Sequence, residues 1–238
     1  MYLVAMNNIN TIFRKMAVCN LNSVVYSHIL QNLNPIINCT SVAVDIIDIE
    51  KNKQHIGDNS WDNTIYRDIN RLKANNVGNV GEKIVQTLFS KCGIDCNVDG
   101  SMTKQSGGGT GDGYILGNTV EIKTARQGKT RTFQHELGEH PWKSSFMILV
   151  DFTPSCYYLT IIKNFSKKHY ITNNRNALPY FDKTITRRKQ NTNTPGAFKL
   201  TLNLKDLEKD GDHIIKICDK TTIKHVTEFV NKQINKHS

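Results

Sequence analysis

Two acidic residues and a lysine stand close together in the middle of this 238-residue sequence, at Asp112, Glu121 and Lys123. Ile122 separates Glu121 from Lys123, so in a β-strand the two charged side chains point to the same face. Asp112 begins a short apolar segment, and a tight turn at 116–119 would bring that segment back alongside Glu121. Two carboxylates beside an ammonium group are suited to bind Mg²⁺ and to hydrolyse a phosphodiester.

The Glu121–Lys123 pair also has a plainer interpretation, because such pairs are more often surface salt bridges than catalytic groups. The catalytic interpretation is favoured here because Val120 and Ile122 flank the pair and a glycine-rich turn precedes it. Hard Mg²⁺ prefers oxygen ligands. Asp112, Glu121 and the backbone carbonyl of Ile122 are therefore the predicted metal ligands.

A further carboxylate, Glu82, is expected at the margin of the buried face of a helix. The sequence predicts a break at 75–81, then this helix, then its end at Gly93. Its buried stripe is Ile84, Val85, Leu88 and Phe89. A glutamate in a first turn can simply complement the helix dipole. The functional alternative directs Glu82 at the same site as Asp112.

Glycines are concentrated just before the acidic cluster, with five between residues 101 and 113. The segment lacks the Gly-Lys-Ser/Thr ending of a nucleotide-binding loop, so we interpret the glycines as permitting a sharp turn or a close approach beside Asp112. Beyond the cluster, 145–152 and 156–163 are predicted to be buried strands joined by a turn at 153–155.

The order of these features resembles the PD-(D/E)XK nuclease superfamily, which includes type II restriction endonucleases and Holliday-junction resolvases. The resemblance covers about residues 79 to 163 and has Gly111 where the motif has its proline. It implies that Asp112 and Glu121 bind the metal and that Lys123 orients or activates the attacking water. It also implies that Glu82 is the accessory acid on the first helix, and that a helix follows the basic loop after Lys123.

The expected fold is therefore α/β, with a mixed central β-sheet flanked by helices in a restriction-endonuclease-like core. One elaborated domain spans 1–238, with a mostly helical N-terminal elaboration at 1–76, the nuclease core at 79–163, and an α+β elaboration for DNA recognition at 164–238. Within the first part, 41–49 is ambiguous but strand-like. An amphipathic helix is predicted from Trp61, Ile65, Ile69 and Leu72.

The C-terminal part is predicted to contain a half-buried strand at 198–204 and a final amphipathic helix from about Lys220. The apolar stripe of that helix is either core or a dimer surface. The motif-like segment 134–140 lacks the second histidine of a zinc protease, although His135 or Glu136 would be able to face the site from a following helix.

Basic residues accompany the candidate site. A loop directly after Lys123 carries three of them, and a later polar segment carries three more. The predicted DNA contacts are Arg126, Lys129, Arg131, Arg187, Arg188 and Lys189. A solvated charge run is the alternative for either segment.

Composition agrees with a nucleic-acid partner. The net charge is +10 and the pI is about 9.3, which favours a polyanion. A hydrophobic content of 38% is typical of a soluble globular protein, and the longest apolar run, 146–150, is too short to span a bilayer. We expect a cytoplasmic protein, and the six scattered cysteines are interpreted as reduced thiols.

These observations predict a Mg²⁺-dependent endonuclease acting on double-stranded DNA, of the type II restriction class. A resolvase or repair nuclease of the same superfamily is the first alternative. A basic DNA-binding protein without catalysis is the second. Cutting both strands of a symmetric site favours a homodimer.

Overall fold

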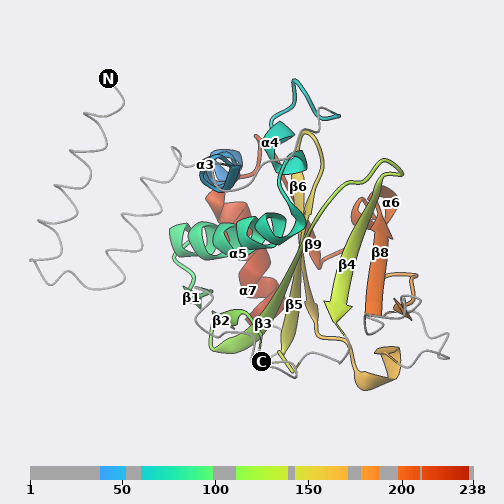
Figure 1. Cartoon of the computed structure of the whole chain (residues 1–238). Coiled ribbons are helices and arrows are strands. Elements are labelled where there is room, and N and C mark those ends of the chain that lie inside the picture. The colour runs from blue at the N-terminus through green and yellow to red at the C-terminus, as the bar shows by residue number, and fades with distance from the viewer. Residues whose placement is uncertain are drawn as a thin grey trace, which may run out of the picture. The chain divides into compact units, whose positions relative to one another are not determined.

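The computed structural model describes residues 38–51, 60–98, 111–138, 143–170, 178, 180–187, 198–209 and 211–235. Within the compact unit 37–238, the described elements form three layers (Figure 1). Helices cover one face of a six-stranded sheet, and a three-stranded sheet lies against part of the other face. The predicted α/β class with a mixed central sheet is confirmed, but the sheet is mostly antiparallel and only one face is covered mainly by helices.

The six-stranded sheet has the order β1-β2-β3-β5-β6-β9. Its parallel pair is β3 (Asn118–Arg126) with β5 (Phe146–Phe152), while every other neighbouring pair is antiparallel. The other strands are β1 (Cys96–Asn97), β2 (Gly113–Ile115), β6 (Tyr157–Lys163) and β9 (Ile214–Ile217). Every residue of β5 is buried, because layers cover both of its faces. The strands predicted at 145–152 and 156–163 are confirmed.

The helical layer contains α3 (Cys39–Lys51), α5 (Ala74–Lys91) and α7 (Ile223–Asn235), with the short α4 (Arg67–Asn70) between α3 and α5 in the chain. The second sheet has the order β4-β8-β7. It is built from β4 (Thr132–Gly138), β8 (Phe198–Asn203) and β7 (Thr186–Arg187), and η2 (Lys167–Tyr170) and α6 (Leu204–Leu207) complete the described elements.

The central sheet separates two apolar clusters. On β5, Ile148 and Val150 pack with the helices, whereas Met147 and Leu149 pack with the second sheet. This alternation is the period-two pattern of a strand buried on both faces. The predicted C-terminal helix is confirmed as α7, and its apolar stripe belongs to the core on the helical side.

Three predicted elements are wrong. Residues 39–51 form helix α3. Its buried face contains two pairs spaced four residues apart, Val42 with Ile46 and Ala43 with Ile47. The helix predicted from Trp61 to Leu72 is reduced to turns and the four residues of α4. The break predicted at 75–81 is helical, because α5 begins at Ala74 and continues through it.

Between Trp61 and α4 the chain turns instead of forming a continuous helix. Thr64 donates both its backbone N–H and its hydroxyl to the carbonyl of Trp61, at 3.2 and 2.6 Å. The Tyr66 N–H then bonds to the carbonyl of Pro154, 3.2 Å away in the β5–β6 turn. These bonds replace the i to i−4 pattern of a helix and leave Ile65 exposed.

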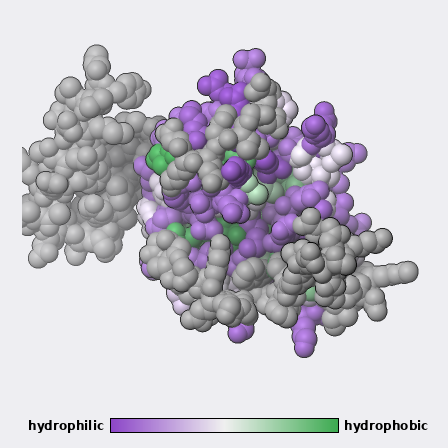
Figure 2. All heavy atoms as spheres, viewed as in Figure 1, coloured by the Kyte–Doolittle hydropathy of each residue, from purple (hydrophilic) through white to green (hydrophobic). Residues whose placement is uncertain are grey.

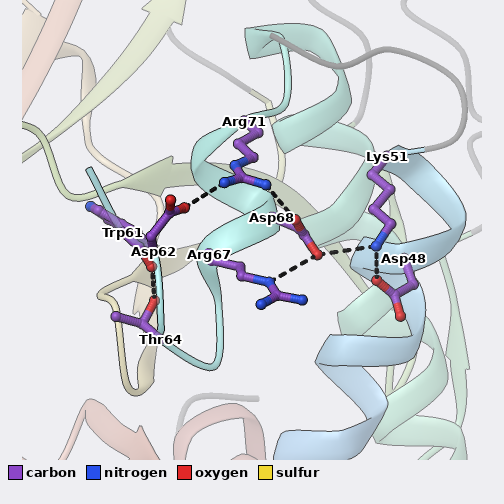
Figure 3. Close-up of polar contacts among 8 residues, drawn as sticks. All are labelled: Asp48, Lys51, Trp61, Asp62, Thr64, Arg67, Asp68 and Arg71. Carbon is purple, nitrogen blue, oxygen red and sulfur yellow. Dashed lines mark hydrogen bonds and ion pairs between the residues drawn. The ribbon is translucent and has the colours of Figure 1, made fainter. Parts of the chain in front are cut away.

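A charged network fixes α4 to its surroundings (Figure 3). Asp68 of α4 pairs with Lys51 of α3 at 3.2 Å and with Arg71 at 3.7 Å. Arg71 also pairs with Asp62 in the preceding turn. Several charges sharing partners hold a short helix better than isolated surface pairs do.

The surface seen in Figure 2 is largely hydrophilic wherever its atoms are not grey. Large apolar side chains that are exposed in the described part are Ile49, Ile65 and Tyr114. None of the described helices combines the length and hydropathy needed to cross a bilayer. Five described cysteines are free thiols, and Cys19 lies outside the described residues.

Candidate functional site

The β2–β3 hairpin brings Asp112 against the middle of β3. Its two-residue turn has Leu116 at φ 48° and Gly117 at φ 73°, the conformation of a type I′ turn, so the turn predicted at 116–119 is centred on Leu116 and Gly117. The Asp112 N–H donates to the carbonyl of Val120 at 2.7 Å. The N–H of Ile122 donates to Asp112 Oδ2 at 2.7 Å, which fixes the carboxylate at the edge of β3.

The glycines on either side of Asp112 allow this close approach. Gly111 has φ +115°, and a Cβ there would lie 2.2 Å from the carbonyl oxygen of Val120. Proline, with φ of about −65°, is excluded from this conformation. A Cβ on Gly113 would lie 2.2 Å from the carbonyl oxygen of Asn97 in β1.

Glu121 and Lys123 share one face of β3, while Val120 and Ile122 pack on the helical side. The Glu121 side chain is 1% exposed and that of Lys123 is 21% exposed. Lys123 Nζ forms an ion pair with Glu121 Oε1. Glu121 Oε2 is buried and has no hydrogen-bond partner among the described residues, although buried carboxylate oxygens normally have one.

The surroundings of Glu121 raise its pKa to about 7. Burial is the largest cause, because removing the carboxylate from water disfavours its charged form. The ammonium of Lys123 opposes this shift, while the negative charges of Asp112 and Glu82 add to it. Glu82, Asp112, Glu121 and Lys123 are therefore close enough to interact electrostatically. A strongly perturbed carboxylate in such a cluster is typical of a functional site.

Helix α5 places Glu82 near this cluster by an unusually close contact with β3. Gly81 faces Thr124, and a Cβ on Gly81 would lie 1.7 Å from Thr124 Oγ1. Only glycine permits the helix to approach so closely. Gly81 directly precedes Glu82, so this contact fixes the position of the Glu82 backbone relative to β3.

The residues of the cluster match the preferences of Mg²⁺. Asp112 and Glu121 are hard oxygen donors, and one buried oxygen of Glu121 lacks a partner. The N–H of Ile122 faces Asp112, and because a strand residue directs its N–H and C=O to the same side, the Ile122 carbonyl faces that edge too. Among the described residues no group of three or more His, Cys, Asp or Glu side chains is arranged to hold a metal. Mg²⁺ commonly uses only one or two carboxylates and retains water.

The predicted DNA-contact residues fall into three groups. Arg126 turns inward, and its Nη1 donates to the carbonyls of Ile69, Asn70 and Leu72 at 2.9, 2.7 and 2.6 Å. Lys129 and Arg131 are exposed on the loop between β3 and β4. Of the later basic segment, Arg187 ends β7 with its side chain outside the described part, and Arg188 and Lys189 lie wholly outside it.

The segment after the basic loop is strand β4, so the helix expected there is wrong. Phe133, His135 and Leu137 are buried, whereas Gln134 and Glu136 are exposed, which is the alternation of a strand. His135 is thereby directed into the layer between the sheets, and Glu136 away from it.

His135 meets a residue that sequence reasoning did not single out, Asp151 of β5. His135 Nε2 lies 3.0 Å from Asp151 Oδ1, and both side chains are 0% exposed. These two atoms are not aligned for a hydrogen bond. His135 Nδ1 and Asp151 Oδ2 have no hydrogen-bond partner in the described part of the chain. An acid directly after the apolar run 146–150 was the available signal, but its partner lies 16 residues away on a different sheet.

Comparison of the chain with protein-family models and with curated proteins found no match. Its function is therefore inferred from the residues of the site itself.

Proposed function

We propose that the chain is a metal-dependent endonuclease that hydrolyses phosphodiester bonds in DNA. The supporting observation is the cluster of charged side chains around Glu121. Glu121 is a buried carboxylate with one unpartnered oxygen and a pKa of about 7. Lys123 pairs with it, and Asp112 and Glu82 act on it electrostatically. The resemblance of residues 79–163 to PD-(D/E)XK nucleases supports the same chemistry, and the net charge of +10 supports an anionic substrate.

Asp112, Glu121 and the carbonyl of Ile122 would hold Mg²⁺. When bound, this cation offsets the negative charge of the phosphate and makes water a better nucleophile. The Ile122 N–H orients Asp112 for this role by fixing Oδ2. Lys123 Nζ, held by Glu121, would donate a hydrogen bond to water or to the phosphate. Because the pKa of Glu121 is about 7, its proton must be displaced for a cation to bind. Activity is therefore expected to rise with pH through this value.

The direct test is incubation of the purified protein with plasmid DNA in Mg²⁺ and, separately, in EDTA. Cleavage should require Mg²⁺ and fall at least about 100-fold in Asp112→Asn and Lys123→Met, because each removes a charged group from the reacting centre. Asp45→Asn and Lys91→Met change exposed residues on α3 and α5 and should cleave as the parent does. Undiminished cleavage by Asp112→Asn would show that the site is misassigned.

The products distinguish the forms that this proposal can take. Discrete fragments identify a type II restriction enzyme, the form we favour because the segments flanking 79–163 are long enough to recognise a sequence. Nicking that requires a four-way junction identifies a resolvase, and binding without cleavage identifies a non-catalytic DNA-binding protein. Light scattering in solution would test the proposed homodimer, which suits the cutting of a two-fold symmetric site.

A further inference from the structure

An open hollow of about 760 Å³ begins one residue beyond Lys123 along β3. Its walls come from the turn and helices between Ser60 and Val77, from the β3–β4 loop and from the β5–β6 turn. Arg126, Lys129 and Arg131 line it, and no acidic side chain is among the described residues that do so. A hollow with cations and no carboxylates favours an anionic ligand.

The wall formed by α4 is fixed in place from two sides. On the outside, Asp68 links α4 to Lys51 and Arg71 in the network of Figure 3. On the inside, Arg126 donates to three carbonyls at the C-terminal end of α4, as a cation at a helix C-terminus does. Arg126 is thus a positioning residue for the wall.

Lys129 and Arg131 are presented by the β3–β4 loop, which turns with its own backbone hydrogen bonds. The N–H of Gly128 donates to the carbonyl of Thr132 at 2.8 Å, and the N–H of Arg131 donates to the carbonyl of Gly128 at 2.9 Å. Both basic side chains are exposed, and neither forms an ion pair within the described part of the chain. They are available to a ligand that enters the hollow.

The hollow and the candidate site lie along the same strand. Ala125, which lines the hollow and shares a face of β3 with Lys123, lies two residues beyond it, a separation of about 7 Å at about 3.3 Å per residue. One DNA strand carries a phosphate about every 3.4 Å along the duplex axis. A strand with its reacting phosphate at Lys123 therefore has neighbouring phosphates within reach of the hollow.

We infer that this hollow is a subsite for the non-reacting phosphates of the nucleic-acid strand next to the scissile bond. Lys129 and Arg131 neutralise those phosphates, and the subsite is indifferent to base sequence because it binds the backbone. That the subsite binds the strand being cut rests on the proposed function. That it binds a phosphate backbone does not.

The test is fluorescence anisotropy with a labelled duplex of arbitrary sequence in EDTA, repeated over a series of salt concentrations. Replacing both loop cations, in Lys129→Gln/Arg131→Gln, should weaken binding about tenfold and reduce the slope of log K against log salt by about two. The matched control is Lys220→Gln/Lys224→Gln, which removes the same charge beside the start of α7. The hollow is lined by Ala74 and Val77 at the N-terminal end of α5. The start of α7 lies at the other end of that helix, because the carbonyl of Ile223 is 3.9 Å from Sγ of Cys92, which follows the last residue of α5.

The control pair should leave the salt slope at the parental value. Equal losses in the two double variants would overturn the inference, because they would reflect net charge alone. A parental slope in Lys129→Gln/Arg131→Gln would also overturn it, even if the protein cleaves DNA in Mg²⁺. If the Lys129→Gln/Arg131→Gln variant alone loses affinity and the parent does not cleave, the subsite stands and the proposed nuclease chemistry fails.

Discussion

Glu121 is the residue at which burial and charge oppose each other most directly. Its pKa is about 7 in the folded chain against 4.5 for an ordinary glutamate, so folding favours its protonated form. The stability gained from that form is complete below about pH 4.5 and is lost as the pH rises through 7. At alkaline pH the folded protein therefore holds a buried carboxylate at a cost that a bound cation would offset.

Glu121→Gln should be stabilising at alkaline pH. Glutamine resembles the protonated acid, so the free energy of unfolding of the variant relative to the parent should increase by about 3 kcal/mol from pH 4.5 to above pH 8 without metal. Urea unfolding at both pH values measures this difference. Saturating Mg²⁺ should instead raise the free energy of unfolding of the parent above that of the variant. A difference that does not change with pH would contradict the raised pKa, and Glu228→Gln on the exposed face of α7 is the matched control.

At the scale of elements, the contact of α5 with β3 decides where Glu82 and Thr124 lie. This contact depends on Gly81, whereas Gly78, one turn earlier in the same helix, has no atom within 4 Å of its would-be Cβ. The two glycines therefore offer a matched pair of substitutions in one helix.

Gly81→Ala should destabilise the protein by about 1 to 3 kcal/mol, because the added methyl group forces the helix from the strand. Gly78→Ala should stabilise it by up to about 1 kcal/mol, because alanine is the better helix former and meets no neighbour. Thermal unfolding compares the two. If both substitutions stabilise equally, α5 does not approach β3 as closely as described.

The elements that the sequence predicted correctly are those whose own pattern decides their structure. Strands β5 and β6 are continuous apolar runs, β8 alternates, and α7 carries an apolar stripe at helical spacing. The β2–β3 hairpin with Asp112, Glu121 and Lys123 was predictable for the same reason, since turn chemistry and period-two alternation are local signals.

The elements that were missed depend on contacts with distant parts of the chain. Helix α3 is rich in β-branched residues, and its packing against α5 overrides their strand preference. The two glycines of α5 suggested a break, but Gly81 serves a tertiary contact with Thr124. Arg126 was assigned to DNA from its position in a basic loop, and the carbonyls that hold it come from 69–72.

At the scale of the whole molecule, the candidate site depends on two sheets packed face to face. Glu121 and Lys123 project from β3 on the side that faces the second sheet, whose β4 runs beside β8 (Figure 1). His135 of β4 and Asp151 of β5 meet in this layer with both side chains fully buried. Most side chains packed in this layer are apolar, so the buried pair is a specific polar link between the sheets.

The link predicts non-additive stability effects. His135→Ala or Asp151→Ala should each cost about 2 to 4 kcal/mol, because the partner left behind is polar, buried and unpaired. His135→Leu/Asp151→Leu removes both polar groups and should cost less than the sum of the single variants. Urea unfolding of the four proteins gives the coupling energy. Thr160→Val on β6 is the control, since it removes a buried hydroxyl without a described partner and should be nearly neutral. Strict additivity would mean that His135 and Asp151 do not interact, and that apolar packing alone joins the two sheets.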